Sequence, residues 1–593
     1  MCIDAVLLFA CSLLAVWIVF GEMPPLFCSL VFSNILALIL LLSVVRFYRI
    51  RISESSLDLF NRGLEGFVPV FIIGVVLVGL YLGFSSSYIP FFFVFDGAGF
   101  LFTMGIRVAF RNVLYYTRKR FNNGKPHAII YGAGELGSTL VRQYQKGKFT
   151  YHVVGLVDDD PKLVGTYVVG MKVYSTVNYL SDVLKETRAK VLIIAITNID
   201  QEHMLKAVDA AKENGCEVKV IPSLFELQQG AKELDLRSLD YGDLLGRPLI
   251  TIDKEPIKQM VRDKRILITG AGGSIGSEIC RQLLSYGPEQ LILLDVDETD
   301  LHDLSLRLHD YQKEWSERIV PVVCDIKNRK KIDRVLEKYA PQIIFHAAAY
   351  KHVPLQELYP EEAITTNIGG SYNVLKSAKD HKVERVVVIS TDKAVNPTNV
   401  MGATKRVVEL MAGMLNSKET EMVCVRFGNV LGSRGSMLPL FMDQIKAGVP
   451  ITVTHREIIR YFMAIPEAVG LVFKAASMAK AGEVMVLDMG QPVKIYDFAE
   501  KLVKYYGDGR SQVIVTGLRP GEKLFEELLA DEDLTIPTED KLVFKAKVSN
   551  NGLHEESFLT ILETLNEKAP EELVATLHEL VPEFKKQQRG VCE

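Results

Sequence analysis

The chain has 593 residues, a formal net charge of −4 and 48% hydrophobic residues. This length exceeds one hydrophobic core and predicts about three or four domains. The charge gives no electrostatic basis for binding nucleic acid. The eight cysteines include no C-x-x-C pair and no cysteine–histidine cluster, so we expect neither disulfides nor a bound metal.

The first 106 residues are dominated by four apolar runs, each close to the ~20 residues with which a helix crosses a bilayer. They lie at 3–20, 26–45, 67–84 and 88–106. A cleaved signal peptide is the alternative for the first run, but that run lacks a basic start and three more runs follow it. We therefore predict a transmembrane region of four helices over 1–106, in contact with the lipid bilayer.

Cationic residues follow the second and fourth runs, whereas the links GEMPP and SSSYIP contain none. The cations are Arg46, Arg49, Arg51, Arg107, Arg111, Arg118, Lys119 and Arg120. The positive-inside rule then predicts that both termini lie in the cytoplasm. Asn34 and Asp96 fall inside the spans, where a polar group is costly and suggests a function. Gly97 and Gly99 follow Asp96, so a helix break or a helix–helix contact explains this region equally well.

Residues 107–125 are basic and polar, which predicts a linker beside the membrane surface. The stretch AIIYGAGELGSTLVRQY then indicates a strand, a glycine turn and an amphipathic helix. The turn glycines are Gly132, Gly134 and Gly137. With two further strands, this pattern predicts a small Rossmann-like, CoA-binding-like α/β domain over 126–225. The turn and Asp158 would suit a nucleotide, but glycines also allow close strand–helix packing, so both interpretations stay open.

Residues 226–260 indicate a connector, and a longer α/β unit follows over 261–545. RILITGAGGSIGSEICRQLL predicts a strand, a turn and a helix, with the glycine spacing that lets the backbone approach a pyrophosphate. The predicted cofactor-binding residues are Gly270, Gly273, Ser274, Ile275, Gly276, Asp295, Asp325, Ile326, Ala347, Ala348 and Lys405. Asp295 ends the second strand, where a carboxylate accepts hydrogen bonds from ribose hydroxyls and repels a 2′-phosphate. NAD is therefore favoured over NADP.

The segment STDKAVNPTNVMGATKR follows an apolar strand and places Lys405 four residues after Met401. Short-chain dehydrogenases carry a tyrosine and a lysine at this spacing, and here the tyrosine is absent. Thr391, Asp392 and Lys393 instead put a hydroxyl, an acid and an amine side by side. They lie at the carboxyl end of a strand, where α/β proteins bind ligands. Plain alcohol oxidation does not need this set of groups, whereas elimination of water does.

On these motifs, residues 262–540 resemble the extended short-chain dehydrogenases that act on nucleotide sugars. The whole chain resembles the membrane-anchored UDP-N-acetylglucosamine 4,6-dehydratases of bacterial polysaccharide and glycan biosynthesis. The resemblance implies a multi-pass protein of the bacterial inner membrane with cytoplasmic catalytic domains, tightly bound NAD, a UDP-sugar substrate and a homo-oligomer. The predicted fold class is α/β, with two Rossmann-like parallel-sheet domains in tandem after the transmembrane region.

The implied reaction takes hydride from C4 of the sugar, eliminates water across C5 and C6, and returns hydride to C6. Asp392 is the predicted acid for the C6 hydroxyl. Lys393 is the predicted base at C5, because an amine buried beside cations such as Lys405 loses its proton readily. Thr391 would hydrogen-bond the C4 oxygen, and Lys405 would bind the nicotinamide ribose. The acceptor of the C4 hydroxyl proton stays open between Asp392, Lys405 and water. Methionine at position 401 can fill an apolar gap. It also matches the large retaining subgroup of the family, so we expect retention at C5.

Further positions match the substrate site of the family. They are Lys351, His352, Asn367, Asn429, Arg434, Arg460, Arg519 and Glu522. The resemblance places Asn367 on a helix that steadies the site, Asn429 near the substrate diphosphate and Arg434 near the uridine-phosphate end. Arginine forks suit phosphate oxygens, and a carboxylate such as that of Glu522 can bind ribose hydroxyls.

Residues 546–593 carry apolar side chains at three- and four-residue steps, which indicates a helical segment. Packing on the catalytic domain, association between chains and a solvated tail all fit this pattern.

Three other functions compete with the dehydratase. A polyprenyl-phosphate sugar-phosphate transferase would need a basic membrane-inserting segment late in the chain, and the sequence has none. A nucleotide-sugar epimerase or reductase should have tyrosine at position 401 and no need for the Asp392–Lys393 pair. A non-enzymatic, membrane-tethered NAD-binding scaffold fits the lost tyrosine but not the polar residues retained around it.

Overall fold

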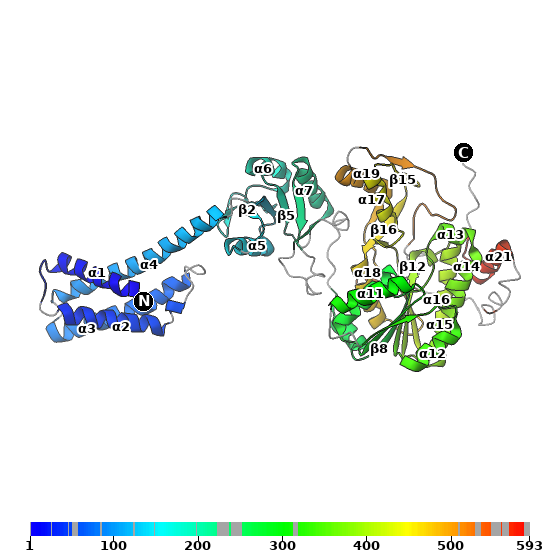
Figure 1. The fold of residues 1–593 in the computed structure, drawn as a ribbon, viewed down its shortest axis with the longest axis horizontal. Helices are drawn as coiled ribbons and strands as arrows, with labels where there is room; N and C mark the ends of the chain where they lie inside the picture. Colours follow the sequence, from blue (N-terminus) through cyan, green and yellow to red (C-terminus); the bar gives the residue numbers. More distant parts are fainter. Residues whose placement is uncertain are drawn as a thin grey trace. The chain divides into compact units, whose positions relative to one another are not determined.

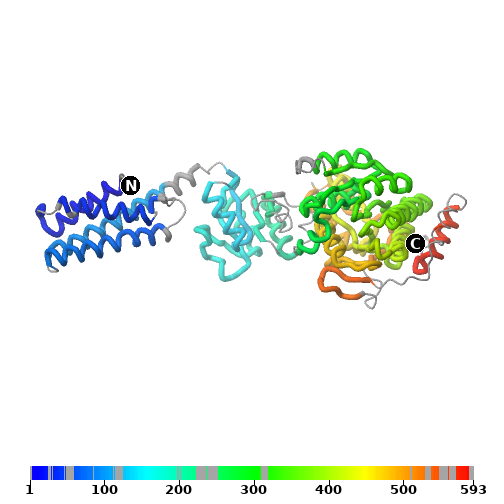
Figure 2. The backbone as a smooth tube through the Cα atoms, turned by 90° about the horizontal axis from the view of Figure 1, so that it is seen from below, coloured from blue at the N-terminus to red at the C-terminus, as the bar shows by residue number. Residues whose placement is uncertain are grey.

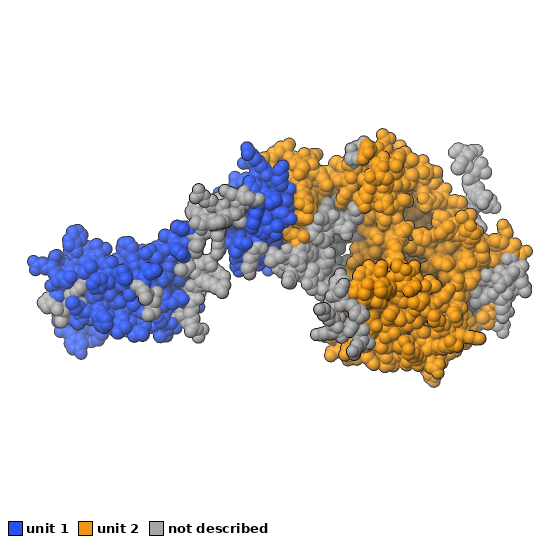
Figure 3. Space-filling view, in the orientation of Figure 1, with its two compact units in different colours: residues 1–157, 162–174, 186–191 blue, residues 158–161, 175–185, 192–593 orange. Residues whose placement is uncertain are grey.

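The computed structural model describes residues 2–24, 27–45, 47–49, 57–83, 86–121, 125–147, 149–196, 199–221, 236–238, 252–311, 318–507, 510–527, 535–546, 559 and 569–585. Most of the predicted connector and of the predicted C-terminal segment lies outside these residues, as do Arg46, Arg51 and the side chains of Arg49, Arg111, Arg118, Lys119 and Arg120. The structure divides into two compact units (Figure 3), one of 1–157, 162–174 and 186–191, the other of 158–161, 175–185 and 192–593.

Four helices begin the chain (Figure 1): α1 (Cys2–Val19), α2 (Phe27–Val44), α3 (Leu57–Leu82) and α4 (Tyr88–Phe121), with a 3₁₀ turn at Phe47–Arg49. α1 packs against α2 and α4, and α3 also packs against both. Leu8, Leu38 and Phe95 are fully buried between the helices, whereas Trp17 and Phe32 are more than 70% exposed. Apolar side chains on the outside of a bundle suit a lipid environment better than water.

Among the described residues, two of these helices are long and apolar enough to cross a membrane, at Leu59–Leu82 and Tyr88–Phe110. The apolar parts of α1 and α2 are shorter, at Ile3–Val19 and Val31–Val44. The four predicted N-terminal helices are therefore confirmed, and four membrane spans remain a prediction.

An ion pair joins α1 to α4. Arg107 donates from Nη1 and Nη2 to the two carboxylate oxygens of Asp4, over 2.8 and 2.7 Å. Arg107, which the sequence predicted to flank the membrane, is thus paired within the bundle. The predicted linker 107–125 is mostly helical, because α4 extends to Phe121. A Cβ atom on Gly99 would lie 2.8 Å from Leu8 Cδ2, so this glycine allows the two helices to approach closely. Of the two structural explanations given for this region, the helix–helix contact is therefore supported.

The small α/β domain has a five-stranded sheet in the order β2-β1-β5-β6-β7. Its strands are β1 (His127–Tyr131), β2 (His152–Val157), β5 (Val191–Ile194), β6 (Glu217–Val220) and β7 (Arg237–Ser238), with a hairpin of β3 (Tyr167–Val168) and β4 (Met171–Lys172). Its helices are α5 (Glu135–Gln145), α6 (Leu180–Thr187) and α7 (Gln201–Glu213), with a 3₁₀ turn at Val177–Tyr179. A Cβ atom on Gly137 would lie 1.9 Å from the Gly132 carbonyl oxygen, so strand–helix packing alone requires this glycine. Ligand binding by this domain stays a prediction.

The second α/β domain is built on a nine-stranded sheet in the order β10-β9-β8-β11-β12-β13-β17-β21-β20. The strands are β8 (Arg265–Thr269), β9 (Gln290–Asp295), β10 (Ile319–Val323), β11 (Ile343–His346), β12 (Arg385–Thr391), β13 (Glu421–Phe427), β17 (Val484–Leu487), β20 (Thr535–Pro537) and β21 (Val543–Ala546). The strands from β10 to β17 run parallel. β21 pairs antiparallel with β17, and β20 pairs antiparallel with β21. The order of the strands reverses between β8 and β11, which in open α/β sheets is where a ligand binds. The predicted α/β fold with parallel sheets is confirmed.

Helices cover both faces of this sheet (Figure 1). They are α9 (Glu255–Val261), α10 (Ser274–Leu283), α11 (Glu298–Tyr311), α12 (Arg329–Tyr339), α13 (Val353–Leu358), α14 (Pro360–Ala363), α15 (Ser371–Asp380), α16 (Val400–Leu415) and α18 (Ile465–Met478), with 3₁₀ turns at Leu284–Tyr286 and Asp392–Ala394 and a π-helical turn at Ile364–Gly370. Val386 and Val388 of β12 belong to one hydrophobic core, and Val387 and Ile389 belong to the other. Successive side chains of a strand point to opposite faces, so an uninterrupted apolar strand is buried on both sides.

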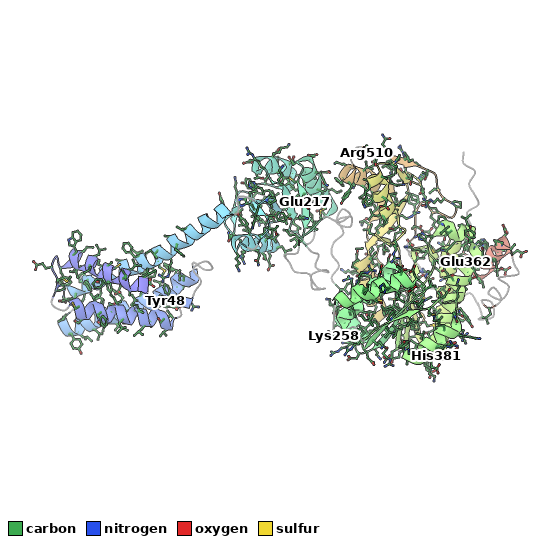
Figure 4. All side chains as sticks on the ribbon, in the orientation of Figure 1. Tyr48, Glu217, Lys258, Glu362, His381 and Arg510 are labelled. Atoms are coloured by element: carbon green, nitrogen blue, oxygen red, sulfur yellow. The ribbon has the colours of Figure 1, made fainter. Side chains whose placement is uncertain are left out.

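A smaller lobe follows the carboxyl ends of the strands. It contains a sheet of β14 (Asn429–Leu431), β16 (Ile459–Ala464) and β18 (Pro492–Lys494), a pair of β15 (Ile451–Val453) and β19 (Val513–Val515), and the helices α17 (Met437–Ala447) and α19 (Ile495–Tyr506). Arg510 in this lobe and His381, which follows α15, lie at opposite ends of the second α/β domain (Figure 4). The lobe therefore faces the carboxyl edge of the sheet.

The C-terminal helix α21 (Pro570–Leu580) packs against α14 and α16 (Figure 2). Leu573, Leu577 and Phe584 belong to the same hydrophobic core as α16. Of the three arrangements that the sequence left open for this segment, the described part packs on the catalytic domain.

Candidate active site

A cavity of about 940 Å³ lies at the carboxyl edge of the large sheet, between the strand ends and the smaller lobe. Most of the predicted site residues line it. These are Gly270, Gly273, Ser274, Ile275, Gly276, Ala347, Lys351, His352, Thr391, Lys393, Met401, Lys405, Asn429, Arg434, Arg460, Arg519 and Glu522. The other predicted residues, which are Asp295, Asp325, Ile326, Ala348, Asn367 and Asp392, are not part of this lining.

The glycine turn between β8 and α10 is tightly packed. Gly270 has a φ of +68°, which is in the left-handed region, and a Cβ atom there would lie 2.7 Å from the Ala348 amide nitrogen. A Cβ atom on Gly276 would lie 2.0 Å from the Gly270 carbonyl oxygen. Gly273 differs, because the nearest atom to its Cβ position is 3.3 Å away and the residue lines the cavity. Bare backbone at the amino terminus of a helix is the arrangement that receives a pyrophosphate.

Asp295 holds this turn from the next strand. Its Oδ2 accepts a hydrogen bond from the Gly272 amide over 2.8 Å, and its Oδ1 accepts one from the Asp297 amide over 3.0 Å. Ile326 is buried, 5% exposed, and packs where a Cβ atom on Gly370 would lie 2.5 Å from its Cδ1 atom. Ile326 therefore has a packing role, whatever else it contacts. The predicted cofactor contacts of both residues stay predictions.

Thr391, Asp392 and Lys393 lie where β12 ends and a 3₁₀ turn begins. The Thr391 hydroxyl donates to Asp392 Oδ1 over 2.8 Å, and Lys393 Nζ donates to the same oxygen over 2.9 Å. Lys393 Nζ also lies 3.3 Å from Asn429 Oδ1 and 3.7 Å from Glu526 Oε1. The Asp392 carboxyl is fully buried beneath the cavity surface, and among the described residues its Oδ2 has no hydrogen-bond partner. The three side chains thus form one connected set, of which Thr391 and Lys393 reach the cavity.

The charge state expected for Lys393 needs a correction. Burial lowers the pKa of this amine, but the carboxylates of Asp392 and Glu526 outweigh burial and raise it above the usual value. The sequence suggested that cations surround this lysine, whereas the structure places it between two acids. Lys393 is therefore protonated in the free protein at neutral pH, and it must pass its proton on before it can act as a base.

The pKa of Lys405, in contrast to that of Lys393, falls below its usual value. Burial lowers the pKa of Lys405 to about 8, and its Nζ donates to the Ile389 carbonyl oxygen over 3.0 Å. Met401 lies one turn earlier on α16 and is 4% exposed. The side chain of Asn399 caps this helix by accepting from the Gly402 amide over 2.8 Å. The helix therefore presents an apolar side chain and a weakly basic amine to the cavity.

Asn367 is fully buried in the π-helical turn and does not reach the cavity. Its side chain accepts from the Tyr350 amide over 2.8 Å and donates to the Tyr350 carbonyl and to Thr404 Oγ1, both over 3.1 Å. It thereby ties the loop after β11 to α16, and π-helical turns are common near functional sites. This position agrees with the predicted steadying role.

Arg434 and Asn429 both line the cavity and contact other residues of the predicted site. The Arg434 guanidinium forms an ion pair with Asp300 and donates to the Gly272 carbonyl oxygen over 3.0 Å. Its backbone amide donates to Ser274 Oγ over 3.1 Å. Arg434 therefore contacts the glycine turn, and Asn429 contacts Lys393. The predicted contacts of both residues with the substrate stay predictions. Both arrangements depend on chain crossings that local sequence does not reveal.

Arg460 and Glu522 meet in the smaller lobe. Arg460 Nη2 lies 3.5 Å from Glu522 Oε1 and donates to the Lys523 carbonyl oxygen over 2.7 Å. Glu522 also accepts from Thr454 Oγ1 over 3.1 Å and from the Arg519 amide over 3.1 Å. The predicted pair of motifs therefore forms one cluster at the cavity wall.

Sequence reasoning missed Glu526, which is 8% exposed and lies within 3.7 Å of both Lys393 Nζ and Arg460 Nε. Its spacing of four residues from Glu522, just after the GLRPGEK motif, was the available signal. It also missed Glu409, which is buried beneath Ser390. A glutamate on an apolar helix face is a signal, because a buried acid needs a partner.

The sheet order, the glycine turn and the cavity define a short-chain dehydrogenase/reductase fold of the epimerase–dehydratase type. The profile of a family described as "Polysaccharide biosynthesis protein" matches residues 266–548, and a "CoA-binding domain" profile matches residues 44–222. The capsular polysaccharide biosynthesis protein CapD of Staphylococcus aureus is 39% identical over 85% of this chain and 84% of its own length. The chain belongs to this family of polysaccharide biosynthesis proteins.

Two further relatives are similar over shorter stretches. The probable polysaccharide biosynthesis protein EpsC of Bacillus subtilis is 40% identical over 72% of each chain. A UDP-glucose 4-epimerase of Rickettsia rickettsii is 34% identical over 46% of this chain and 80% of its own length.

Proposed function

We propose that this protein is an NAD-dependent 4,6-dehydratase of UDP-N-acetylglucosamine that supplies a 4-keto-6-deoxy amino sugar for surface polysaccharide. The observation that carries the proposal is the Asp392–Lys393 pair, joined over 2.9 Å at the wall of a cavity that has methionine at position 401. An epimerase needs no acid and base dedicated to water loss. The names of the relatives CapD and EpsC support a polysaccharide product.

The glycine turn and Asp295 fit a dinucleotide. Gly273 leaves open backbone at the start of α10, and Asp295 lies at the end of the adjacent strand. A carboxylate in this place favours NAD over NADP. When bound, NAD supplies the acceptor and donor of hydride in this reaction.

Lys393 and Asp392 would reach their working states together. If Lys393 passes its proton to Asp392, the amine becomes a base for the C5 proton and the carboxylic acid becomes a proton donor for the C6 hydroxyl, with no change in total charge. The 2.9 Å separation of Nζ and Oδ1 permits this transfer directly. Because Asp392 is buried beneath the cavity, the Thr391 hydroxyl, 2.8 Å from Oδ1, connects it to the substrate. Each turnover then removes one proton at C5, releases one water at C6, and returns a proton from the Lys393 ammonium to C5 when hydride adds to C6.

The test is to incubate the full chain in detergent with UDP-N-acetylglucosamine and NAD in heavy water. We expect a product that has a C4 ketone, deuterium at C5 and a methyl group at C6, because the C5 proton exchanges through the amine. Mass spectrometry measures the loss of one water together with the gain of one deuterium. NMR locates the deuterium and gives the C5 configuration, which we expect to be retained. Recovery of an unlabelled substrate would contradict the proposal.

Epimerisation at C4 or C5 is the second candidate, because a UDP-glucose 4-epimerase is 34% identical over 283 residues. The same incubation separates the two. An epimer that keeps its 6-hydroxyl would show that the protein is an epimerase. The Asp392–Lys393 pair would then not have the proposed role in water loss.

Lys405 should impose an alkaline limit on activity. Burial lowers the pKa of Lys405 to about 8, so this amine is charged below that pH and neutral above it. The proposed role, binding the nicotinamide ribose and keeping the local potential positive, needs the charged form. We therefore expect turnover to fall as the pH rises through about 8. In the variant Lys405→Arg the limit should move to higher pH, because arginine stays charged. A rise in turnover through the same range would instead assign Lys405 as the base for the C4 hydroxyl proton.

We also propose that the N-terminal helices hold the protein in a bacterial inner membrane with its catalytic domains in the cytoplasm. The two helices at Leu59–Leu82 and Tyr88–Phe110 support this arrangement. A homo-oligomer remains part of the same proposal.

A further inference from the structure

A buried network of charges lies directly behind the candidate active site. Glu409 of α16 is 2% exposed and accepts from Ser390 Oγ over 2.6 Å. It also accepts from Arg426 Nε and Nη2, each over 2.6 Å, and from Arg406 Nη1 over 3.2 Å. A buried carboxylate is stable only when such partners surround it, and the two guanidinium groups help to hold the pKa of Glu409 below its usual value despite burial.

This network joins the two strand ends that carry the proposed catalytic groups. Ser390 lies on β12 immediately before Thr391 and lines the cavity. Arg426 lies on β13, three residues before Asn429, which contacts Lys393 Nζ. Through Ser390 and Arg426, Glu409 therefore bridges β12 and β13, which also pair with each other at these two residues.

The C-terminal segment completes the network from outside. Glu583 Oε1 accepts from Arg406 Nε over 2.9 Å. Two residues later, the Lys585 amide donates to the Pro397 carbonyl oxygen over 2.9 Å, in the loop between Lys393 and Met401. The buried leucines of α21 hold this segment against α16. The segment thus contacts the loop between Lys393 and Met401 through Lys585, and it contacts the buried charged network through Glu583.

We propose that residues 570–585 are a positioning element of the active site, acting from Glu583 through Arg406 and Glu409 on Ser390. Its effect on catalysis rests on the proposed function, whereas its effect on the order of the β12 end does not. Arg406 is 7% exposed and is shared between Glu583 and Glu409. Without Glu583, Arg406 competes more strongly for Glu409, and the bonds from Glu409 to Ser390 and Arg426 weaken.

The test compares Glu583→Gln with Glu579→Gln in the full chain. The first variant keeps the shape of the side chain and removes its charge. The second is matched because Glu579 is exposed on α21, four residues before Glu583. We expect amide hydrogen exchange in residues 390–395 to rise about tenfold in Glu583→Gln and to stay unchanged in Glu579→Gln. We also expect kcat to fall about tenfold while KM for the UDP-sugar changes less than about twofold, as coupling through a network allows.

A double-mutant cycle identifies the route. Because Glu583 acts through Arg406, adding Glu583→Gln to Arg406→Gln should change exchange in 390–395 no further. Fully additive effects would overturn the route, and unchanged exchange in the single variant Glu583→Gln would overturn the proposal. Should Glu583→Gln fail to fold, Glu583→Asp keeps the charge but shortens the side chain, so it should weaken the bond to Arg406 Nε and raise exchange in 390–395 above that of the wild type. Exchange in Glu583→Asp equal to the wild type would then overturn it. If Glu583→Gln raises exchange but the wild type shows no turnover, the coupling between Glu583 and the end of β12 stands and the proposed dehydratase activity is wrong.

Discussion

Replacing Lys393 by methionine is expected to stop water loss, lowering turnover by about 100- to 10,000-fold, the usual loss when a general base is removed. Methionine has nearly the length of lysine and fills the same space, so the cavity should keep its shape. The dinucleotide should stay bound, because no residue of the glycine turn contacts Lys393 within hydrogen-bonding distance among the described residues. The measurement is product formation together with the NAD content of the purified protein.

The matched control is Lys480→Met, which removes an exposed lysine of the same domain and should leave turnover unchanged. In Lys393→Met, the carboxyl of Asp392 loses its ion pair while it stays buried. If Lys393→Met keeps more than about a tenth of wild-type turnover, the lysine is not the C5 base.

Gly276→Ala is expected to disrupt the glycine turn and release the dinucleotide. The added Cβ atom would lie 2.0 Å from the Gly270 carbonyl oxygen and 2.9 Å from Ala271 Cα, and backbone atoms cannot move aside as a side chain can. We expect a loss of stability at or above the usual ~1–3 kcal/mol of overpacking. Thermal denaturation measures the loss, and the NAD content of the purified protein measures retention.

Gly273→Ala is the informative comparison. Its Cβ atom would lie 3.3 Å from the Gly270 carbonyl oxygen, a tight contact that a small shift relieves, so the melting temperature should fall much less than in Gly276→Ala. Because Gly273 lines the cavity, the same methyl group would block the close approach of a pyrophosphate and lower NAD retention. Equal NAD retention in both variants and the wild type would show that the turn does not bind the cofactor.

Features that depend on residues close together in the chain could be predicted. The strand before the glycine turn, the turn itself and the helix after it follow from local apolar patterns and glycine spacing, and the structure contains all three. The neighbouring positions of Thr391, Asp392 and Lys393 are guaranteed by the covalent chain. Their place at the carboxyl end of a strand follows from the apolar run that precedes them.

Features that depend on distant segments could not be predicted. The pKa of Lys393 is raised because Glu526, more than 130 residues later in the chain, lies beside it. Arg434 contacts the glycine turn only because the segment after β14 folds back across it. The last turn of the C-terminal segment reaches Arg406 only because the apolar face of α21 packs on α16.

The amino-acid sequence by itself determined the order of the parts, the α/β fold and which chemical groups stand next to one another on the chain, because periodicity and spacing are local properties. Tertiary structure alone decided the protonation state of Lys393, the position of Arg434 and the task of the C-terminal segment. Electrostatic interactions and packing act through space, so these properties depend on which distant side chains the fold brings within a few ångströms.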